Sequence, residues 1–198
     1  VVTMVVNPNS SFTLYNVPVD FTYNSTSYTS KGLDIVNNPE KSVSLKLEGN
    51  GYDLSGLKAE DFVVYPDYSS VNGPGEVTLP LRVLVRDSAS QVKATVIKDE
   101  RVSVVFDSVE EKTFTVQVQA SDLTIAEGYI LQGTVASPSS VTVNGPASEV
   151  DSIDRIVARV EPSSDLENMS ESKIKTVTLE AQDAQGQPLS LQYTTMDT

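Results

Sequence analysis

Apolar and polar residues alternate along most of this chain with a period of two, which predicts β-strands. The clearest run covers residues 43–47, where valine and leucine alternate with Ser44 and Lys46. The polar segment 24–31, rich in Ser, Thr and Tyr, interrupts the pattern. Further alternating runs are 17–23, 33–36, 62–65, 77–85, 92–97, 102–106, 113–116, 141–143, 156–160, 177–181 and 189–193. The predicted fold class is therefore mostly β.

One stretch, residues 133–166, organises the rest of the chain. Its first strand, 141–143, is followed by the sequence Asn-Gly-Pro at 144–146, which predicts a tight corner. Glycine accepts a positive φ, and proline fixes φ and cannot donate to a β-ladder. We therefore expect Gly145 to adopt a left-handed conformation and the strand to end before it.

A short helical turn is predicted after this corner. Ser148 precedes Asp151 by three residues, a spacing that resembles a capping box with a carboxylate near the helix N-terminus. Val150 and Ile153 are three residues apart and would share one face of the turn. The strand 156–160 follows, and Pro162 is expected to end it.

A second copy of this stretch lies earlier in the chain. Its corner is 49–51, its predicted helix N-cap is Asp53, and Leu54 and Leu57 would share a helical face. A constant offset of 96 residues places Gly32 on Gly128, Leu45 on Val141, Leu47 on Val143, Gly49 on Gly145, Leu54 on Val150, Leu57 on Ile153, Val64 on Val160 and Pro66 on Pro162. The shared positions are strand faces, corners and strand ends, which predicts a tandem duplication of one β domain.

The repeat extends in both directions and predicts the domain boundaries. Residues 77–79 fall on 177–179, and Val19 and Phe21 fall on Val116 and Val118. Domain one is predicted at 1–107, with a lead-in at 1–16, and domain two at 108–198, with a linker at 107–112. Domain two has no counterpart of the strand 102–106, so it is either cut short or closed differently. The apolar run 1–6 fits a first strand or the end of a membrane helix.

Composition excludes several kinds of chemistry. The chain has no cysteine and no histidine, so disulfides, thiolate nucleophiles and the commonest general base and metal ligand are absent. The net charge is −13, which argues against a nucleic-acid surface. The charge is uneven, because residues 1–107 hold 9 basic and 13 acidic residues while residues 108–198 hold 5 and 14. Solubility is the simplest role for this acidity.

Carboxylates and tyrosines are the remaining candidates for function. The carboxylate pairs Glu60/Asp61, Glu110/Glu111 and Asp151/Asp154 fit no metal or acid–base motif, so we interpret them as solvated. No catalytic, cofactor-binding or metal-binding residue is predicted, and no cofactor. Domain one, called unit one below, is rich in tyrosines, whose role is either core packing or a binding face. These are Tyr15, Tyr23, Tyr28, Tyr52, Tyr65 and Tyr68.

The sequence resembles a known bacterial family, the YbbR-like domain, as two tandem copies. The resemblance rests on Asn-Val-Pro-Val-Asp at 16–20, Gly-Tyr-Ile-Leu-Gln-Gly at 128–133, the stretch 137–146, and Val-Asp-Ser-Ile-Asp-Arg-Ile at 150–156. Unit one departs from the pattern, with Glu-Gly-Asn at 48–50 where unit two has Asn-Gly-Pro. The resemblance implies β domains of twisted strands with one short helical turn each.

The resemblance also implies a function. YbbR-like proteins typically carry an N-terminal membrane helix followed by domains outside the membrane, and CdaR-type members regulate a membrane-bound diadenylate cyclase that makes cyclic di-AMP. The predicted function is thus a non-enzymatic, extracytoplasmic interaction module of a membrane-anchored regulator, with that cyclase as partner. The alternative is a structural or wall-polymer-binding envelope module. RNA binding, suggested by a ribosomal relative of the domain, is disfavoured by the charge.

Overall fold

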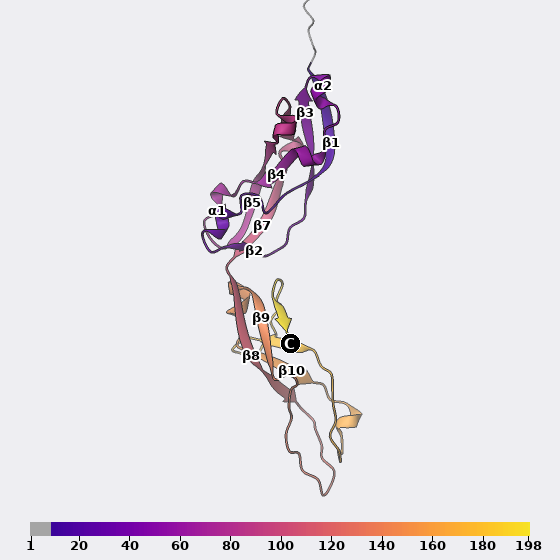
Figure 1. Cartoon of the computed structure of the whole chain (residues 1–198). Coiled ribbons are helices and arrows are strands. Elements are labelled where there is room, and N and C mark those ends of the chain that lie inside the picture. The colour runs from indigo at the N-terminus through magenta and orange to yellow at the C-terminus, as the bar shows by residue number, and fades with distance from the viewer. Residues whose placement is uncertain (1–8) are drawn as a thin grey trace, which may run out of the picture. The chain divides into compact units, whose positions relative to one another are not determined.

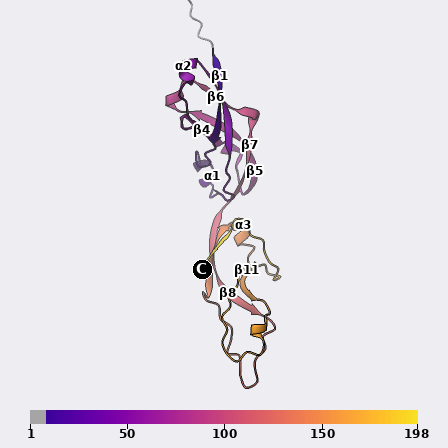
Figure 2. The same cartoon turned by 90° about the vertical axis from the view of Figure 1, so that its right-hand side faces the viewer.

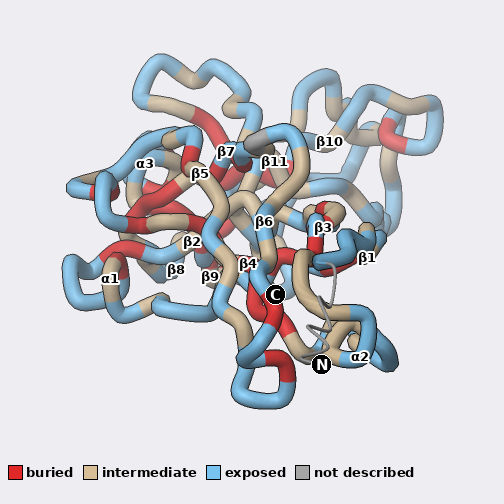
Figure 3. The backbone as a smooth tube through the Cα atoms, turned by 90° about the horizontal axis from the view of Figure 1, so that it is seen from above, coloured by how far each residue is buried: buried red, intermediate tan, exposed pale blue. Residues whose placement is uncertain are grey.

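The chain folds into two units of β-structure, and the computed structural model describes residues 9–198. Unit one ends at Asp107 and unit two begins at Ser108. Strands dominate both units, with only short helical turns between them (Figures 1 and 2). Buried residues concentrate on the strands, and most exposed residues lie in the connections (Figure 3). The prediction of a mostly β fold is confirmed. The predicted roles of residues 1–6 lie outside the described residues.

Unit one contains two sheets. One has the strand order β1-β3-β6 and the other β2-β7-β5-β4. The strands are β1 (Ser10–Pro18), β2 (Asp34–Ile35), β3 (Ser42–Gly49), β4 (Phe62–Pro66), β5 (Gly75–Val85), β6 (Lys93–Val96) and β7 (Arg101–Asp107). The helices are α1 (Thr26–Thr29) and α2 (Gly51–Leu54), with 3-10 turns η1 (Ala59–Asp61), η2 (Tyr68–Ser70), η3 (Asp87–Ala89) and η4 (Ile97–Asp99).

Two apolar cores hold unit one together. The first core centres on β3, where Val43, Leu45 and Leu47 are at most 3% exposed, as their alternation predicts. The second core lies between α1, η2, β5 and β7, and comprises Tyr28, Leu33, Tyr68, Val71, Leu79, Val102, Val104 and Phe106. Phe21 and Leu81 pack against both cores and connect them.

Unit two has one five-stranded sheet of order β11-β10-β8-β9-β12. Its elements are β8 (Val109–Ala120), β9 (Ser140–Pro146), α3 (Ala147–Val150), β10 (Arg155–Val160), the 3-10 turn η5 (Ser164–Leu166), β11 (Leu179–Gln182) and β12 (Thr195–Asp197). Its single core cluster packs α3 and the following Ile153 against the sheet, with Val141, Val143, Val150 and Ile156 almost fully buried.

The two units share one strand order. Strands β5, β4, β1, β3 and β6 of unit one correspond to β11, β10, β8, β9 and β12 of unit two. In unit one the join between β4 and β1 is reduced to a single parallel bridge, Val19 to Val64, whereas β8 and β10 form a continuous parallel ladder. Helix α2 starts at Gly51 and helix α3 at Ala147, so these two helices keep the predicted offset of 96 residues.

The ladders correct the predicted register at three places. On β8, Val116 and Val118 correspond to Val17 and Val19 instead of Val19 and Phe21, because these residues occupy the same places on the ladders with the neighbouring strands. In unit two the strand after the helix lies where it was predicted, but its alignment with unit one is shifted by two positions, so that Ala158 matches Val64 and Val160 matches Pro66.

The cause of that shift is the missing η1. Five positions separate Leu57 from Phe62, where η1 lies, but only three separate Ile153 from Ile156. The third correction follows from the pairing of β10 with β11 and of β4 with β5. Leu179 pairs with Ala158 as Val83 pairs with Val64, so residues 177–179 correspond to 81–83 and not to 77–79.

The predicted helix caps are also wrong. Asn50, not Asp53, caps α2, and its side chain accepts a hydrogen bond from the Asp53 backbone N–H at 2.9 Å. In unit two the helix begins directly after Pro146, so Ser148 lies inside α3 and Asp151 follows its end. β9 continues through the predicted corner, because its residues up to Pro146 pair with β8.

Gly145 does not have the predicted positive φ. It lies within β9, opposite Glu110, and a Cβ atom at this position would lie 2.8 Å from the Cα of Thr194. Glycine is therefore required by the close approach of the segment leading into β12. The corresponding Gly49 has more room, since its nearest neighbours would be 3.6 Å from a Cβ.

Three further expectations are wrong. The predicted linker 107–112 belongs mostly to β8, which begins at Val109 and pairs Lys112 with Val143. The polar segment 24–31 contains α1, so unit one has more than one helical turn; α1 forms because Tyr28 packs into the second core. Residues 189–193 form no strand; Leu189 and Leu191 pack against the core, and β12 follows.

We expect Val143→Asp to unfold unit two. Val143 is fully buried, so the substitution places an unpaired charge in an apolar core, at a cost above about 4 kcal/mol. Asn144→Asp adds the same charge at the next, exposed residue and should change stability little. Heteronuclear NMR spectra would report each unit separately. Native resonances for unit two in the Val143 variant would contradict the core assignment.

A second prediction compares the two equivalent glycines. Gly145→Ala should destabilise unit two by about 1–3 kcal/mol, because the methyl group overlaps the Thr194 backbone. Gly49→Ala should be neutral or slightly stabilising, because the site has room and alanine restricts the unfolded chain. Chemical denaturation of both variants measures the difference. Equal effects would show that the Thr194 contact does not constrain this position.

Candidate functional site

Most carboxylates of the predicted pairs form local hydrogen bonds or ion pairs. Asp61 accepts hydrogen bonds from Ser88 Oγ at 2.6 Å and from the Lys58 backbone N–H at 2.8 Å, which fixes η1. The hydrogen bond from Ser88, supported by that from Lys58, lowers the pKa of the Asp61 carboxyl. Its neighbour Glu60 lies 3.9 Å from Lys58 Nζ on the surface. A carboxylate held ionised in this way is unsuited to proton transfer near neutral pH.

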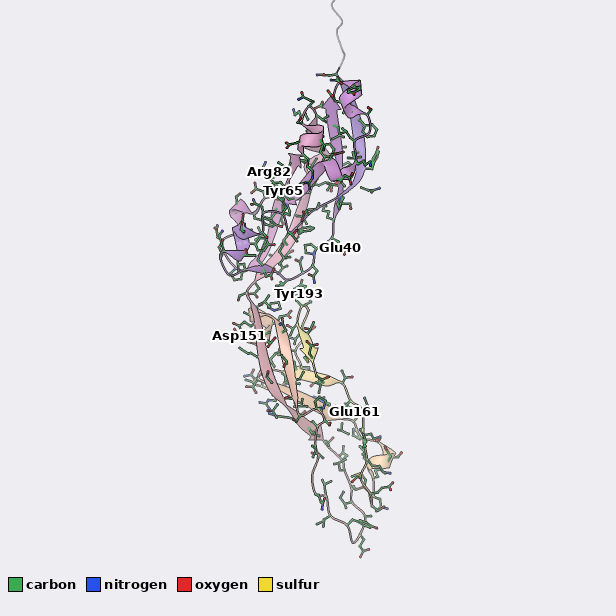
Figure 4. All side chains as sticks on the ribbon, in the orientation of Figure 1. Glu40, Tyr65, Arg82, Asp151, Glu161 and Tyr193 are labelled. Carbon is green, nitrogen blue, oxygen red and sulfur yellow. The ribbon has the colours of Figure 1, made fainter. Side chains whose placement is uncertain are left out.

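The acidic residues of unit two form surface ion pairs. Lys112 Nζ contacts Asp151 and lies 3.6 Å from Glu110, and the hydrogen bond to Asp151 raises the pKa of Lys112. Asp154 pairs with Arg155 at 2.9 Å. Figure 4 shows Asp151 on the outside of its unit. One carboxylate of each predicted pair, Glu110 and Asp151, therefore lies beside Lys112, and Asp154 is paired with Arg155 instead.

The tyrosine-rich region of unit one divides into separate environments. Tyr28 and Tyr68 are buried, with ring centroids 4.9 Å apart, and both pack on Phe106. The Tyr68 hydroxyl donates a hydrogen bond to the Phe21 carbonyl at 2.7 Å, and burial raises the pKa of this phenol. These two residues serve the second core, as the packing alternative predicts.

The other tyrosines do not form a single face. Tyr23 and Tyr65 contact each other with ring centroids 4.6 Å apart, and Tyr65 pairs across the strands with Arg82, as Figure 4 shows. Tyr15 and Tyr52 are 68% and 86% exposed, and stand on β1 and α2. The six tyrosines thus provide no continuous binding surface.

Glu149 was not singled out by the sequence analysis, yet it anchors a whole segment. Its carboxylate accepts hydrogen bonds from the Gln192 N–H at 2.8 Å, the Tyr193 N–H at 3.1 Å and Thr194 Oγ1 at 2.6 Å. We call this arrangement the Glu149 clasp. Burial alone would raise the pKa of Glu149, but these hydrogen bonds outweigh it and lower the pKa below its ordinary value.

Residues 9–198 were also compared with the requirements of a metal-binding cluster and of a membrane-spanning helix. Within that range, no cluster of three or more Asp and Glu side chains is placed to hold a metal ion. The same residues contain no helix long and apolar enough to cross a membrane. The features that the structure builds from polar side chains are caps, clasps and ion pairs.

Comparison with known proteins identifies the family. The family model described as YbbR-like protein matches residues 17–106 and again residues 114–196. The chain belongs to the YbbR-like family. The two matches cover both units, which confirms the tandem arrangement of YbbR-like domains. Each match contains the central strand and helical turn of its unit, β3 with α2 and β9 with α3.

A solved structure of a YbbR-like protein, from Streptococcus pneumoniae TIGR4, is similar to this chain at 21% sequence identity. The similarity covers 98% of this chain and 96% of that chain, with a TM-score of 0.42. No curated protein matches the sequence.

The Glu149 clasp predicts a pH dependence for the second YbbR-like unit. Because folding lowers the pKa of Glu149, its contribution is complete above the unfolded value near 4.5 and is lost as the pH falls through the folded value. Glu149→Gln should therefore cost about 1–3 kcal/mol at neutral pH and less in acid. Denaturant titrations of the parent and the variant, at neutral pH and below pH 4.5, measure the change in the free energy of unfolding.

The matched control is Glu161→Gln, which removes the same charge from an exposed residue at the end of β10 (Figure 4). It should leave the free energy of unfolding within about 0.5 kcal/mol of the parent at either pH. A Glu149 effect that stayed constant across the pH range would refute the assignment of the clasp to the ionised carboxylate.

Proposed function

We propose that this chain is a non-enzymatic, extracytoplasmic interaction module of a membrane-anchored regulator of a diadenylate cyclase. The observation that carries the proposal is membership of the YbbR-like family across both units. The family is not known for an enzymatic activity, and the chain has neither histidine nor cysteine. That the chain is not an enzyme, and that the cyclase is its partner, stay predictions.

The surface chemistry supports action through protein contacts rather than through the nucleotide. With a net charge of −13, the chain would repel an anionic ligand such as cyclic di-AMP. Among residues 9–198, no group of three or more carboxylates is placed to hold a cation that could bridge a phosphate. An effect on cyclic di-AMP would then pass through the cyclase itself.

Co-expression tests this proposal. The cyclase is expressed with a membrane-anchored form of the chain, with the unanchored chain, or alone, and cyclic di-AMP is measured. We expect the anchored form to change the nucleotide level several-fold, because anchoring raises the effective concentration at the cyclase. The unanchored chain should have a weak effect or none.

Two results would contradict the proposal. Equal cyclic di-AMP levels in all three strains would reject regulation of the cyclase and favour a structural envelope module. Calorimetry with purified chain and cyclic di-AMP should show no heat of binding; saturable binding would reject the indirect mechanism.

A further inference from the structure

The same tetrapeptide occurs once in each unit of this chain. Residues 71–74 and residues 143–146 both have the sequence Val-Asn-Gly-Pro. The Asn-Gly pair inside it is reactive, because glycine has no Cβ to hinder the approach of its backbone nitrogen to the preceding side chain. Since the local sequence is identical at the two places, any difference in reactivity between them comes from the fold.

The reaction open to an Asn-Gly pair is deamidation. The glycine backbone nitrogen attacks the asparagine Cγ, its hydrogen passes through solvent to Nδ2, and ammonia leaves as a succinimide ring closes. Water then opens the ring at either carbonyl carbon. Opening at Cγ gives aspartate, whereas opening at the main-chain carbonyl gives isoaspartate, whose backbone runs through Cβ and Cγ. The reaction therefore needs a glycine N–H that is free of the sheet, and a backbone that can bend toward the side chain.

Solvent exposure does not distinguish the two asparagines. Asn72 and Asn144 both have exposed side chains. The valine before each of them, Val71 or Val143, is fully buried. Water and hydroxide therefore reach both side chains equally, and the difference between the two pairs lies in the glycine that follows.

The Gly145 N–H is held in the sheet of unit two. β9 lies alongside β8 (Figure 1), and Gly145 is opposite Glu110 in their ladder. The Ala147 N–H donates to the Ser108 carbonyl at 2.8 Å, and hydrogen-bonded pairs recur at every second residue of an antiparallel ladder. Gly145 and Glu110 are therefore such a pair, in which the Gly145 N–H donates to the Glu110 carbonyl.

The backbone of this pair is also fixed from the other side. Asn144 is opposite Thr195 of β12, whose Oγ1 donates to the Asn144 carbonyl at 3.4 Å. A Cβ on Gly145 would lie 2.8 Å from the Cα of Thr194, so the backbone has no room to bend toward a ring. Deamidation of Asn144 thus requires β9 to leave the sheet.

In unit one the same tetrapeptide joins η2 to β5 and lies outside the strands. Within residues 9–198 the Gly73 N–H donates no hydrogen bond. In the same range the Asn72 side chain makes one, from Nδ2 to the Ser70 carbonyl at 3.3 Å, which is long for a hydrogen bond. Apart from the adjoining residues, nothing in this range lies within 4 Å of the place that a Gly73 Cβ would take. This pair therefore has an unbonded nucleophile, a weakly held leaving group and room to bend.

A third Asn-Gly pair, Asn50 with Gly51, has a different residue before it, Gly49, and is not a matched comparison. The Asn50 side chain caps α2. Its Oδ1 accepts from the Asp53 N–H at 2.9 Å, and its Nδ2 donates to the Asp53 carboxylate. Both polar atoms of this side chain are thus engaged, which disfavours attack on its Cγ.

We propose that Asn72 is a site of spontaneous deamidation and isoaspartate formation, and that the fold protects Asn144 in the identical sequence. The product gains a negative charge beside Lys31, whose Nζ donates to the Val71 carbonyl. Isoaspartate also adds Cβ to the backbone between Val71, buried in the second core, and the start of β5 at Gly75. The inference concerns the chemistry of the chain itself and does not depend on the cyclase or on any other partner.

Incubation of the full chain in warm, mildly alkaline buffer tests the proposal. Samples taken over time are digested, and chromatography with mass spectrometry measures aspartate and isoaspartate at both sites. We expect Asn72 to convert at least about tenfold faster than Asn144, because reaction at Asn144 requires an opening of the central strand. In guanidinium chloride, which unfolds the chain, the two rates should agree within about twofold, because only the local sequence then matters.

Gly73→Ala is the matched variant. The added methyl group hinders attack by the backbone nitrogen of residue 73, but it fits the fold, because the site has room and Gly73 has no positive φ. Conversion of Asn72 should slow severalfold in this variant. Asn144 should keep its rate, and the circular dichroism should match that of the parent.

Four results would overturn the proposal. Equal rates at the two sites of the folded chain, or no conversion of Asn72 while the chain is folded, would show that Asn72 is not a preferred site. A faster rate at Asn72 that persists in guanidinium chloride would show that the fold does not cause the difference. An unchanged rate at Asn72 in Gly73→Ala would exclude attack by the nitrogen of residue 73.

Discussion

The burial of one central strand in each unit is the constraint on which the rest of the structure depends. Leu45 and Leu47 of β3, and Val141 and Val143 of β9, are at most 1% exposed. Each strand has a neighbour on both sides and a helical turn at its end, so its apolar face is enclosed from several directions. Strand period alone determines which residues face the core, and a slip of one residue would expose the whole face.

The residues around the helical turn that follows each central strand differ between the two units. In unit one the Asn50 side chain caps α2, and the segment leading into β6 packs near Gly49 at ordinary distances. In unit two α3 has no side-chain cap; instead it presents Glu149, which binds the segment leading into β12. Gly145 leaves room for this segment and Glu149 accepts hydrogen bonds from it, so the two residues together fix its position.

This difference shows what the sequence could predict and what it could not. Alternation located most strands, and the fixed offset between Leu45 and Val141 or Leu54 and Val150 detected the duplication, because core positions are constrained by packing alone. The role of Gly145 could not be read in this way. Its reason is the backbone of Thr194, 49 residues later in the sequence, and local turn chemistry gave a plausible but wrong alternative.

The role of Glu149 could not be predicted for the same reason, because its hydrogen-bond partners are brought to it only by the pairing of β12 with β9. The register of β10 depended on the two residues that η1 adds to unit one, and no pattern in unit two marks their absence. The exposure of Tyr129, Ile130 and Leu131 could not be predicted either, because an apolar sequence does not reveal whether the fold covers it.

The connections between the strands are also held by different contacts in the two units. Unit one covers β5 with β7 and β2, and its second core is closed. In unit two the connections after β8 and β10 are joined by backbone hydrogen bonds between residues 124–126 and 166–169. The central strands match because their buried faces fix the register, whereas a connection that buries few side chains is free to use other contacts.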